Sequence, residues 1–118
     1  MEFKKKLINK VEKIQDRELV NNVLCVVEAI KQSDKNLAIS YLKAAAARDV
    51  ECPEIYNLLG ILYESIGDNI KASRYYRVAY YMDQTFKPAQ ENLDRVTNWA
   101  YRGFHNVSWG LERVGGKA

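Results

Sequence analysis

Residues 53–86 read PEIYNLLGILYESIGDNIKASRYYRVAYYMDQTF. The proline, glycine and aspartate residues in this stretch are typical of helix ends and indicate two helices. Pro53 suits the first turn of a helix, because the amide proton that proline lacks has no partner there. Gly67 is a typical residue just after the end of a helix, and Asp68 is a typical N-cap of the next one. We therefore predict an antiparallel helix pair joined by a tight turn, with the second helix reaching about Met82.

Gly60 lies inside the first of these helices, where glycine costs about 0.5–1 kcal/mol relative to alanine. A close contact between helices that leaves no room for a side chain would offset this cost. We predict that Gly60 lies at such a contact. Gly60→Leu should then destabilise the fold by overpacking, on the order of 1–3 kcal/mol or more.

Apolar residues recur at helical spacing along the rest of the chain, and no stretch alternates as a strand does. The pattern predicts an amphipathic helix at the N-terminus, then helices that begin after Asp16 and Asp34, and a last helix from about Lys87 to at least Arg102. The remaining tail is ambiguous, because several apolar residues in it are spaced to line a short helix: Phe104, Val107, Trp109, Leu111 and Val114.

The quoted stretch has counterparts at a distance of 34 residues, which is the mark of a repeat array. The matching pairs are Asp34 and Asp68, Ala38 and Ala72, Leu42 and Tyr76, Ala45 and Ala79, and Leu59 and Leu93. The predicted single domain has an N-terminal capping helix over 1–16, a degenerate repeat over 19–52, a clear repeat over 53–86, a partial repeat with a capping segment over 87–114 and a flexible end over 115–118.

The clear repeat resembles the tetratricopeptide repeat, whose pattern places W-x2-L-G-x2-Y on the first helix and A-x3-F on the second. The matching residues are Tyr56, Leu59, Gly60, Tyr63, Ala72, Tyr76 and Ala79, with tyrosine in place of the tryptophan and the phenylalanine. Gln84 stands where a proline is usual. The resemblance implies an all-α fold of antiparallel helix–turn–helix repeats stacked as a short right-handed α-solenoid. The small residues would let helices approach, and the aromatic ones would fill the space between them.

In this family the first helices of the repeats line a concave groove that binds a peptide or helix of a partner protein. The resemblance places eight residues in this groove: Val23, Val27, Ile30, Asn57, Ile61, Glu64, Glu91 and Arg95. The flanking groove positions hold Val20, Lys31, Glu54, Ser65, Pro88, Asn98 and Trp99. An alternative stays open for the apolar end of the groove, whose aliphatic residues would instead be covered by the N-terminal helix or by the tail.

Composition favours one globular domain and excludes several classes of protein. The chain has 118 residues, is 47% hydrophobic and 28% charged, and has a net charge of +3, below the strong excess of a dedicated nucleic-acid binder. The lysine-rich start lacks the apolar run of a signal peptide, and no stretch approaches the roughly 18 apolar residues of a membrane span. Two cysteines do not suggest a disulfide framework, so we predict a cytoplasmic protein without membrane association.

The sequence also lacks the residue patterns of a catalytic or cofactor site. Its only histidine, His105, has no accompanying nucleophile and carboxylate in a catalytic pattern. Metal-binding and phosphate-binding motifs do not occur. We therefore expect a non-catalytic interaction scaffold with no cofactor, whose partner is another protein.

Two further possibilities remain open. Phe104 and Trp109 either cover the last helix or form a patch through which two copies associate. RNA or nucleic-acid binding is the alternative function, because basic and aromatic side chains that hold phosphates and stack bases recur near residues 71–81. The residues concerned are Lys71, Arg74, Tyr75, Arg77 and Tyr81, although an ordinary solvated helix face explains the same pattern.

Overall fold

The computed structural model describes residues 12–115, and their regular structure is entirely helical. Within that range five α-helices and one short 3₁₀ helix occur and no strand does, which confirms the predicted all-α class. The elements are α2 (Arg17–Lys31), α3 (Lys35–Arg48), α4 (Pro53–Ser65), α5 (Asn69–Met82), α6 (Lys87–Thr97) and η1 (Glu112–Val114).

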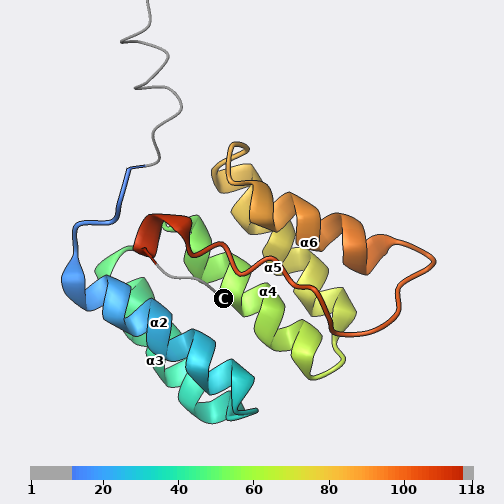
Figure 1. The fold of residues 1–118 in the computed structure, drawn as a ribbon, viewed down its shortest axis with the longest axis horizontal. Coiled ribbons are helices and arrows are strands. Elements are labelled where there is room, and N and C mark those ends of the chain that lie inside the picture. The colour runs from blue at the N-terminus through green and yellow to red at the C-terminus, as the bar shows by residue number, and fades with distance from the viewer. Residues whose placement is uncertain (1–11, 116–118) are drawn as a thin grey trace, which may run out of the picture.

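Helices that follow one another in the chain pack side by side (Figure 1). α2 packs along α3, α4 packs along α5, and α6 packs against α5. α4 also contacts α2 and α3, so it joins the first helix pair to the rest of the molecule. The C-terminal segment turns back after α6 and runs across α4, between α2 and α6.

Three helix starts and the end of α4 lie where the turn residues predict them. Asp16, Asp34 and Asp68 precede α2, α3 and α5, and the side chain of each accepts a main-chain hydrogen bond from the first turn of its helix. These bonds satisfy donors that have no partner within the helix. Gly67, just after α4, has a φ of +87°, a left-handed conformation that glycine adopts without strain. The predicted caps are therefore confirmed.

Gly60 lies at a helix contact, as its position in the sequence predicts. A Cβ atom at residue 60 would lie 2.4 Å from two carbons of the Tyr76 ring, which no real contact allows. Tyr76 belongs to α5 and is fully buried. The absence of a side chain at Gly60 is therefore what lets this ring lie against α4.

Most of the buried apolar side chains form one cluster that extends from α2 to α5 and includes two residues of the C-terminal segment, Leu111 and Val114. Of the predicted packing residues, Gly60, Ala72, Tyr76 and Ala79 are buried. Tyr56, Leu59 and Tyr63 are half-buried against the cluster.

The last α-helix is shorter than predicted: α6 ends at Thr97 instead of reaching Arg102. Asn98 is extended, with a ψ of 133°, and its side-chain oxygen accepts a hydrogen bond from the Ala100 N–H at 2.8 Å. This local bond offers the main chain an alternative to the next helical turn. The prediction of a helix to at least Arg102 is therefore wrong.

The predicted N-terminal helix over 1–16 is also wrong where it can be compared. Residues 12–16 are not helical, and the Ile14 N–H donates to the Arg113 carbonyl oxygen at 2.8 Å. Pairing with the C-terminal segment therefore takes the place of a helical bond at Ile14. The rest of that prediction falls on residues 1–11, and most of the predicted flexible end falls on residues 116–118. Both ranges lie outside the described residues.

Candidate functional site

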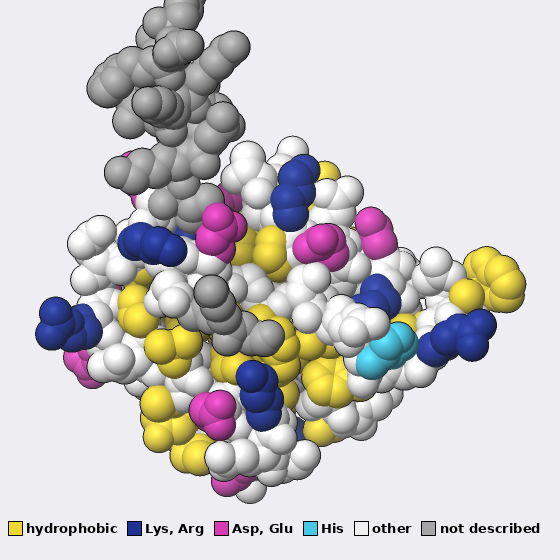
Figure 2. Space-filling model, viewed as in Figure 1, with side chains coloured by type: hydrophobic (Ala, Val, Ile, Leu, Met, Phe, Trp, Pro, Cys, Tyr) yellow, Lys and Arg dark blue, Asp and Glu magenta, His cyan; other side chains and the backbone are white. Residues whose placement is uncertain are grey.

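The candidate site is the face formed by α2, α4 and α6, which we call the α2–α4–α6 face. Residues 107–114, which we call the tail segment, lie on it (Figure 1). Figure 2 shows the same side of the molecule, with hydrophobic side chains gathered in its middle and charged ones around and among them. The segment makes three kinds of contact with the face: hydrogen bonds from amide side chains, an ion pair and apolar packing.

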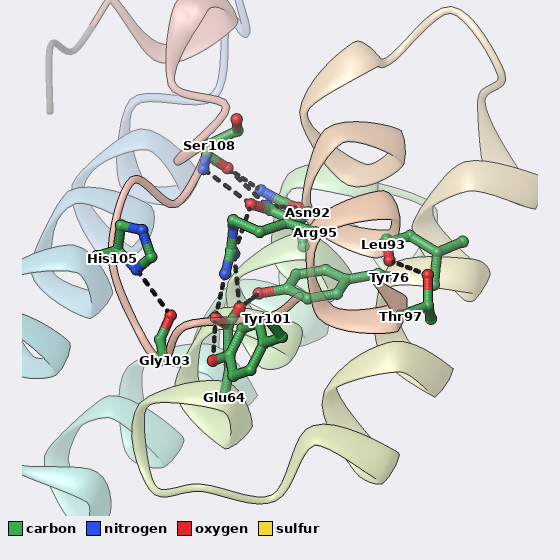
Figure 3. Close-up of polar contacts among 11 residues, drawn as sticks. Glu64, Tyr76, Asn92, Leu93, Arg95, Thr97, Tyr101, Gly103, His105 and Ser108 are labelled. Atoms are coloured by element: carbon green, nitrogen blue, oxygen red, sulfur yellow. Dashed lines mark hydrogen bonds and ion pairs between the residues drawn. The ribbon is translucent and has the colours of Figure 1, made fainter. Parts of the chain in front are cut away.

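Two asparagine side chains bind the main chain of the tail segment. Asn57 Nδ2 donates to the carbonyl oxygens of Ser108 and Trp109 at 3.0 and 3.2 Å. Asn92 Nδ2 donates to the Ser108 carbonyl oxygen at 2.9 Å, and its Oδ1 accepts from the Ser108 N–H at 2.8 Å (Figure 3). Asn92 Nδ2 also donates to Asn57 Oδ1 at 2.9 Å, so the two amides form one unit.

Both asparagines are fully buried, and the tail segment supplies several of their partners. Without it, Asn57 Nδ2 would lose both hydrogen bonds found here, and a buried donor without a partner costs about 1–3 kcal/mol. The hydrogen bonds between the two asparagines and the tail segment involve only main-chain atoms of the tail. The pair therefore recognises an extended backbone and is indifferent to the side chains that the backbone carries.

An ion pair holds the end of the tail segment. Arg113 Nε and Nη2 donate to the two carboxylate oxygens of Glu54 at 2.7 and 2.8 Å. The Glu54 side chain is fully buried, and it also accepts a hydrogen bond from Cys52 Sγ at 3.2 Å. The hydrogen bond to Glu54 raises the pKa of Arg113. Burial first, and then the charge of Glu54, raises the pKa of the Cys52 thiol to about 12.

A second buried carboxylate, Glu64, lies near the other end of α4. Its partners are Tyr76 Oη at 2.8 Å, Tyr101 Oη at 2.8 Å and a two-point contact with the Arg95 guanidinium (Figure 3). Burial and the neighbouring Glu64 raise the pKa values of both tyrosines, and the hydrogen bond to Glu64 raises that of Arg95.

The apolar residues of the tail segment complete the core. Leu111 and Val114 are buried, and Val107 and Trp109 pack against the same cluster. Lys31 Nζ lies 5.4 Å from the centre of the Trp109 ring, within the range of a cation–π contact.

Gly110 has a φ of +72°, and a Cβ there would lie 2.5 Å from Cζ of Phe86. Glycine is therefore required both by the conformation and by the space at this position.

The predicted groove residues do not form an open groove. Six of the eight are buried, namely Val23, Val27, Ile30, Asn57, Ile61 and Glu64, whereas Arg95 is half-buried and Glu91 is exposed. The aliphatic residues of α2 belong to the same cluster as Leu111 and Val114. The sequence left open whether these aliphatic residues line a groove or are covered by another part of the chain. At the apolar end they are covered by the tail segment.

Three features of the site differ from the sequence-based expectation or lie beyond it. Asn92 was not among the predicted groove residues, although it lies one position beyond the 34-residue counterpart of Asn57. Trp99, a predicted flanking position, is 97% exposed because α6 ends before it. Residues 107–111 of the tail segment are not helical, and only Glu112–Val114 form a 3₁₀ helix where a longer short helix was considered. The alternation of Val107, Trp109 and Leu111 is the signal in the sequence against a helix there.

His105 and Phe104 take no part in the site. His105 is exposed, and its Nδ1 lies 2.9 Å from the Gly103 carbonyl oxygen (Figure 3). Phe104 is 41% exposed, whereas Trp109 packs against the core cluster. Between residues 12 and 115, no three or more His, Cys, Asp or Glu side chains lie together as a metal site would require.

Part of the basic and aromatic set is occupied within the fold. The Tyr63 and Tyr75 rings stack with their centres 5.5 Å apart, and Lys71 Nζ lies 5.1 Å from the centre of the Tyr63 ring. The other members, Arg74, Arg77 and Tyr81, are exposed on α5.

The chain was compared with protein-family models, curated proteins and solved structures. No family model, no curated protein and no solved structure matches the chain. None of the helices in residues 12–115 combines the length and the apolar character of a membrane span.

Proposed function

We propose that this chain is a non-catalytic interaction scaffold of the tetratricopeptide type, whose α2–α4–α6 face binds an extended segment of a partner protein. The observation that carries the proposal is the recognition of the tail segment by Asn57 and Asn92 through main-chain atoms alone. A surface that holds one extended segment in this way has the hydrogen-bonding groups to hold another.

Repetition in the fold supports the tetratricopeptide assignment. α5 spans Asn69–Met82, and each of its ends lies 34 residues after the corresponding end of α3, Lys35–Arg48. The N-caps Asp34 and Asp68 make equivalent bonds, each at 3.1 Å to the N–H three residues on. We therefore propose that the helix pairs are stacked repeats of a short right-handed solenoid, with α2, α4 and α6 along its concave side.

The tail segment is then an occupant that a partner must replace. A segment tethered to its own site competes at an effective concentration in about the millimolar range. The partner binds only if its contacts exceed those of the tail at the concentration present. Self-association, in which a second copy provides the segment, is a close variant of the same proposal.

Selection from a phage-displayed library of 12-residue peptides on the immobilised full-length protein tests this function. We expect binding peptides to be recovered, and more readily from the Arg113→Gln chain, in which the tail is held less firmly. Asn57→Ala combined with Asn92→Ala should abolish their binding, whereas Asp94→Ala, at an exposed position of α6 outside the predicted groove, should not. Circular dichroism of each variant tests whether it is folded. Peptides that still bind without the two asparagines would contradict the proposal.

A further inference from the structure

We infer that the α2–α4–α6 face selects partner segments that carry the tail's own pattern: an apolar residue, a glycine directly after it, and an arginine three residues after the glycine. In the tail segment these positions are Trp109, Gly110 and Arg113. The inference rests on the proposed function and states which segments the site accepts.

The two asparagines set the register without reading side chains. Asn57 and Asn92 hold the carbonyl oxygens of residues 108 and 109 and the N–H of residue 108. A partner residue at the place of Ser108 needs only a free main-chain N–H, which excludes proline. Selectivity must therefore come from the positions on either side of these bonds.

Glycine is the first selective position. Gly110 follows the bonded residues directly, and the Phe86 and Pro88 side chains at the start of α6 close the space where a Cβ would lie. Its positive φ adds a second reason, since other residues rarely adopt that conformation. An occupant without glycine here must move α6 or leave the register that the asparagines set.

Arginine is the second selective position. Glu54 is fully buried, so any occupant that displaces Arg113 without supplying a cation leaves a buried carboxylate without its ion pair. The planar guanidinium contacts both carboxylate oxygens, at 2.7 and 2.8 Å. Lysine offers a single charged centre and does not reproduce this two-point geometry.

The apolar positions add affinity with less selectivity. Trp109 is half-buried beneath Lys31, and Leu111 is buried in the core cluster. Other large apolar side chains of similar volume are tolerated at such positions better than a changed charge or an added Cβ. The glycine and the arginine together are therefore the identifying features of the partner segment.

The experiment uses the full-length Arg113→Gln chain, whose own tail lacks the arginine, and a fluorescein-labelled peptide of residues 105–115, HNVSWGLERVG. Fluorescence anisotropy should show binding to this chain, at least about tenfold tighter than to the wild-type chain, because the wild-type tail keeps its ion pair and competes in cis. Replacing the peptide's arginine by glutamine, or its glycine by alanine, should weaken binding at least about tenfold.

The matched control is the peptide with glutamine in place of its glutamate, which corresponds to the exposed Glu112 and should bind within about twofold of the original. Equal binding of all four peptides would overturn the inference and leave the proposed function standing. Failure of every tail peptide, while library peptides still bind, would also overturn it. Failure of both kinds of peptide would overturn the inference and the proposed function together.

A second measurement covers the case in which Arg113→Gln does not fold. In the wild-type chain, millimolar unlabelled peptide should accelerate hydrogen exchange of the Ser108 amide at least about tenfold, because the displaced tail loses its bond to Asn92. The peptide with glutamine in place of arginine should not, and equal acceleration by both peptides would overturn the inference. If the wild-type chain forms a dimer that dissociates when the peptide is added, the segment comes from a second copy of the chain. That result would overturn the inference of a separate partner protein.

Discussion

Glu54 and Glu64 make the same kind of contact at opposite ends of α4, but they join different parts of the molecule. Both carboxylates are fully buried and both are paired with an arginine. The partners of Glu64 come from α5, from α6 and from Tyr101 just beyond α6. The partner of Glu54 is Arg113, at the far end of the tail segment. One pair therefore joins helices to each other, and the other joins the tail to a helix.

The difference lies in what each buried charge can do when its partner leaves. Glu64 is held by residues of both α5 and α6 as well as by Tyr101, which links this ion pair to the packing of the helices. Around Glu54 only the tail segment must lift. The same residue type at two ends of one helix is thus expected to support stability at one end and exchange at the other.

Arg95→Met should produce the largest effect, because it removes the cation from the Glu64 end. A buried carboxylate without its ion pair costs about 3–5 kcal/mol. We expect a loss of this size in the free energy of urea-induced unfolding, followed by helical circular dichroism. Glu91→Met, on the exposed side of the same helix, is the control and should be close to neutral.

Gly60→Leu tests the middle of α4, between the two carboxylates. Its side chain would collide with the Tyr76 ring, and Tyr76 also donates to Glu64. We expect destabilisation on the order of 1–3 kcal/mol or more in the same assay. Melting at the wild-type temperature would mean that the ring moves aside freely, and the Glu64 end would then be less rigid than proposed.

Arg113→Met should have a smaller global effect, about 1–2 kcal/mol, because the tail can lift and let water reach Glu54. Its main effect should be local. Hydrogen exchange at the Ser108 amide should accelerate at least about tenfold, while amides in the middle of α4 keep nearly their wild-type rates. Equal acceleration at both places would erase the proposed difference between the two carboxylates.

The smallest expected effect is the contribution of the Cys52 thiol to the pH dependence of stability. Its pKa is raised from 9.0 in the unfolded chain to about 12 in the fold, so the folded state holds this proton more tightly. The corresponding stability is fully present below pH 9 and is lost as the pH rises from about 9 towards 12. We expect the stability of the wild-type chain to fall relative to Cys52→Ala over this range. Parallel pH profiles for the two proteins would contradict the shift.

Features set by neighbouring residues were predicted from the sequence. The aspartate caps, the glycine after α4 and the close contact at Gly60 depend on residues a few positions apart or on a repeated pattern, and each was found. The groove positions identified Asn57 as a functional candidate, but they did not reveal what it binds.

The path of the chain after α6 was not predicted, since it depends on distant partners. Helical spacing continues up to Asn98, where the side-chain oxygen accepts a hydrogen bond from the Ala100 N–H and the helix has ended. The tail docks on the α2–α4–α6 face because Asn57, Asn92 and Glu54 bind it, and each lies at least 16 residues away from the residue it contacts. The alternation of apolar residues in the tail argues against a helix, but no local pattern identifies the surface on which the tail docks.

The bonds between the two ends of the described chain carry a consequence for the order of folding. Lys13 Nζ donates to the Glu112 carbonyl oxygen, across 99 positions of sequence, whereas each helix pair is joined by a turn of a few residues. Contacts between close neighbours form before those that must close a long loop. We therefore expect a newly made chain to have its helices assembled before the tail docks. In that interval the α2–α4–α6 face stands open, and a partner that arrives then meets no competitor.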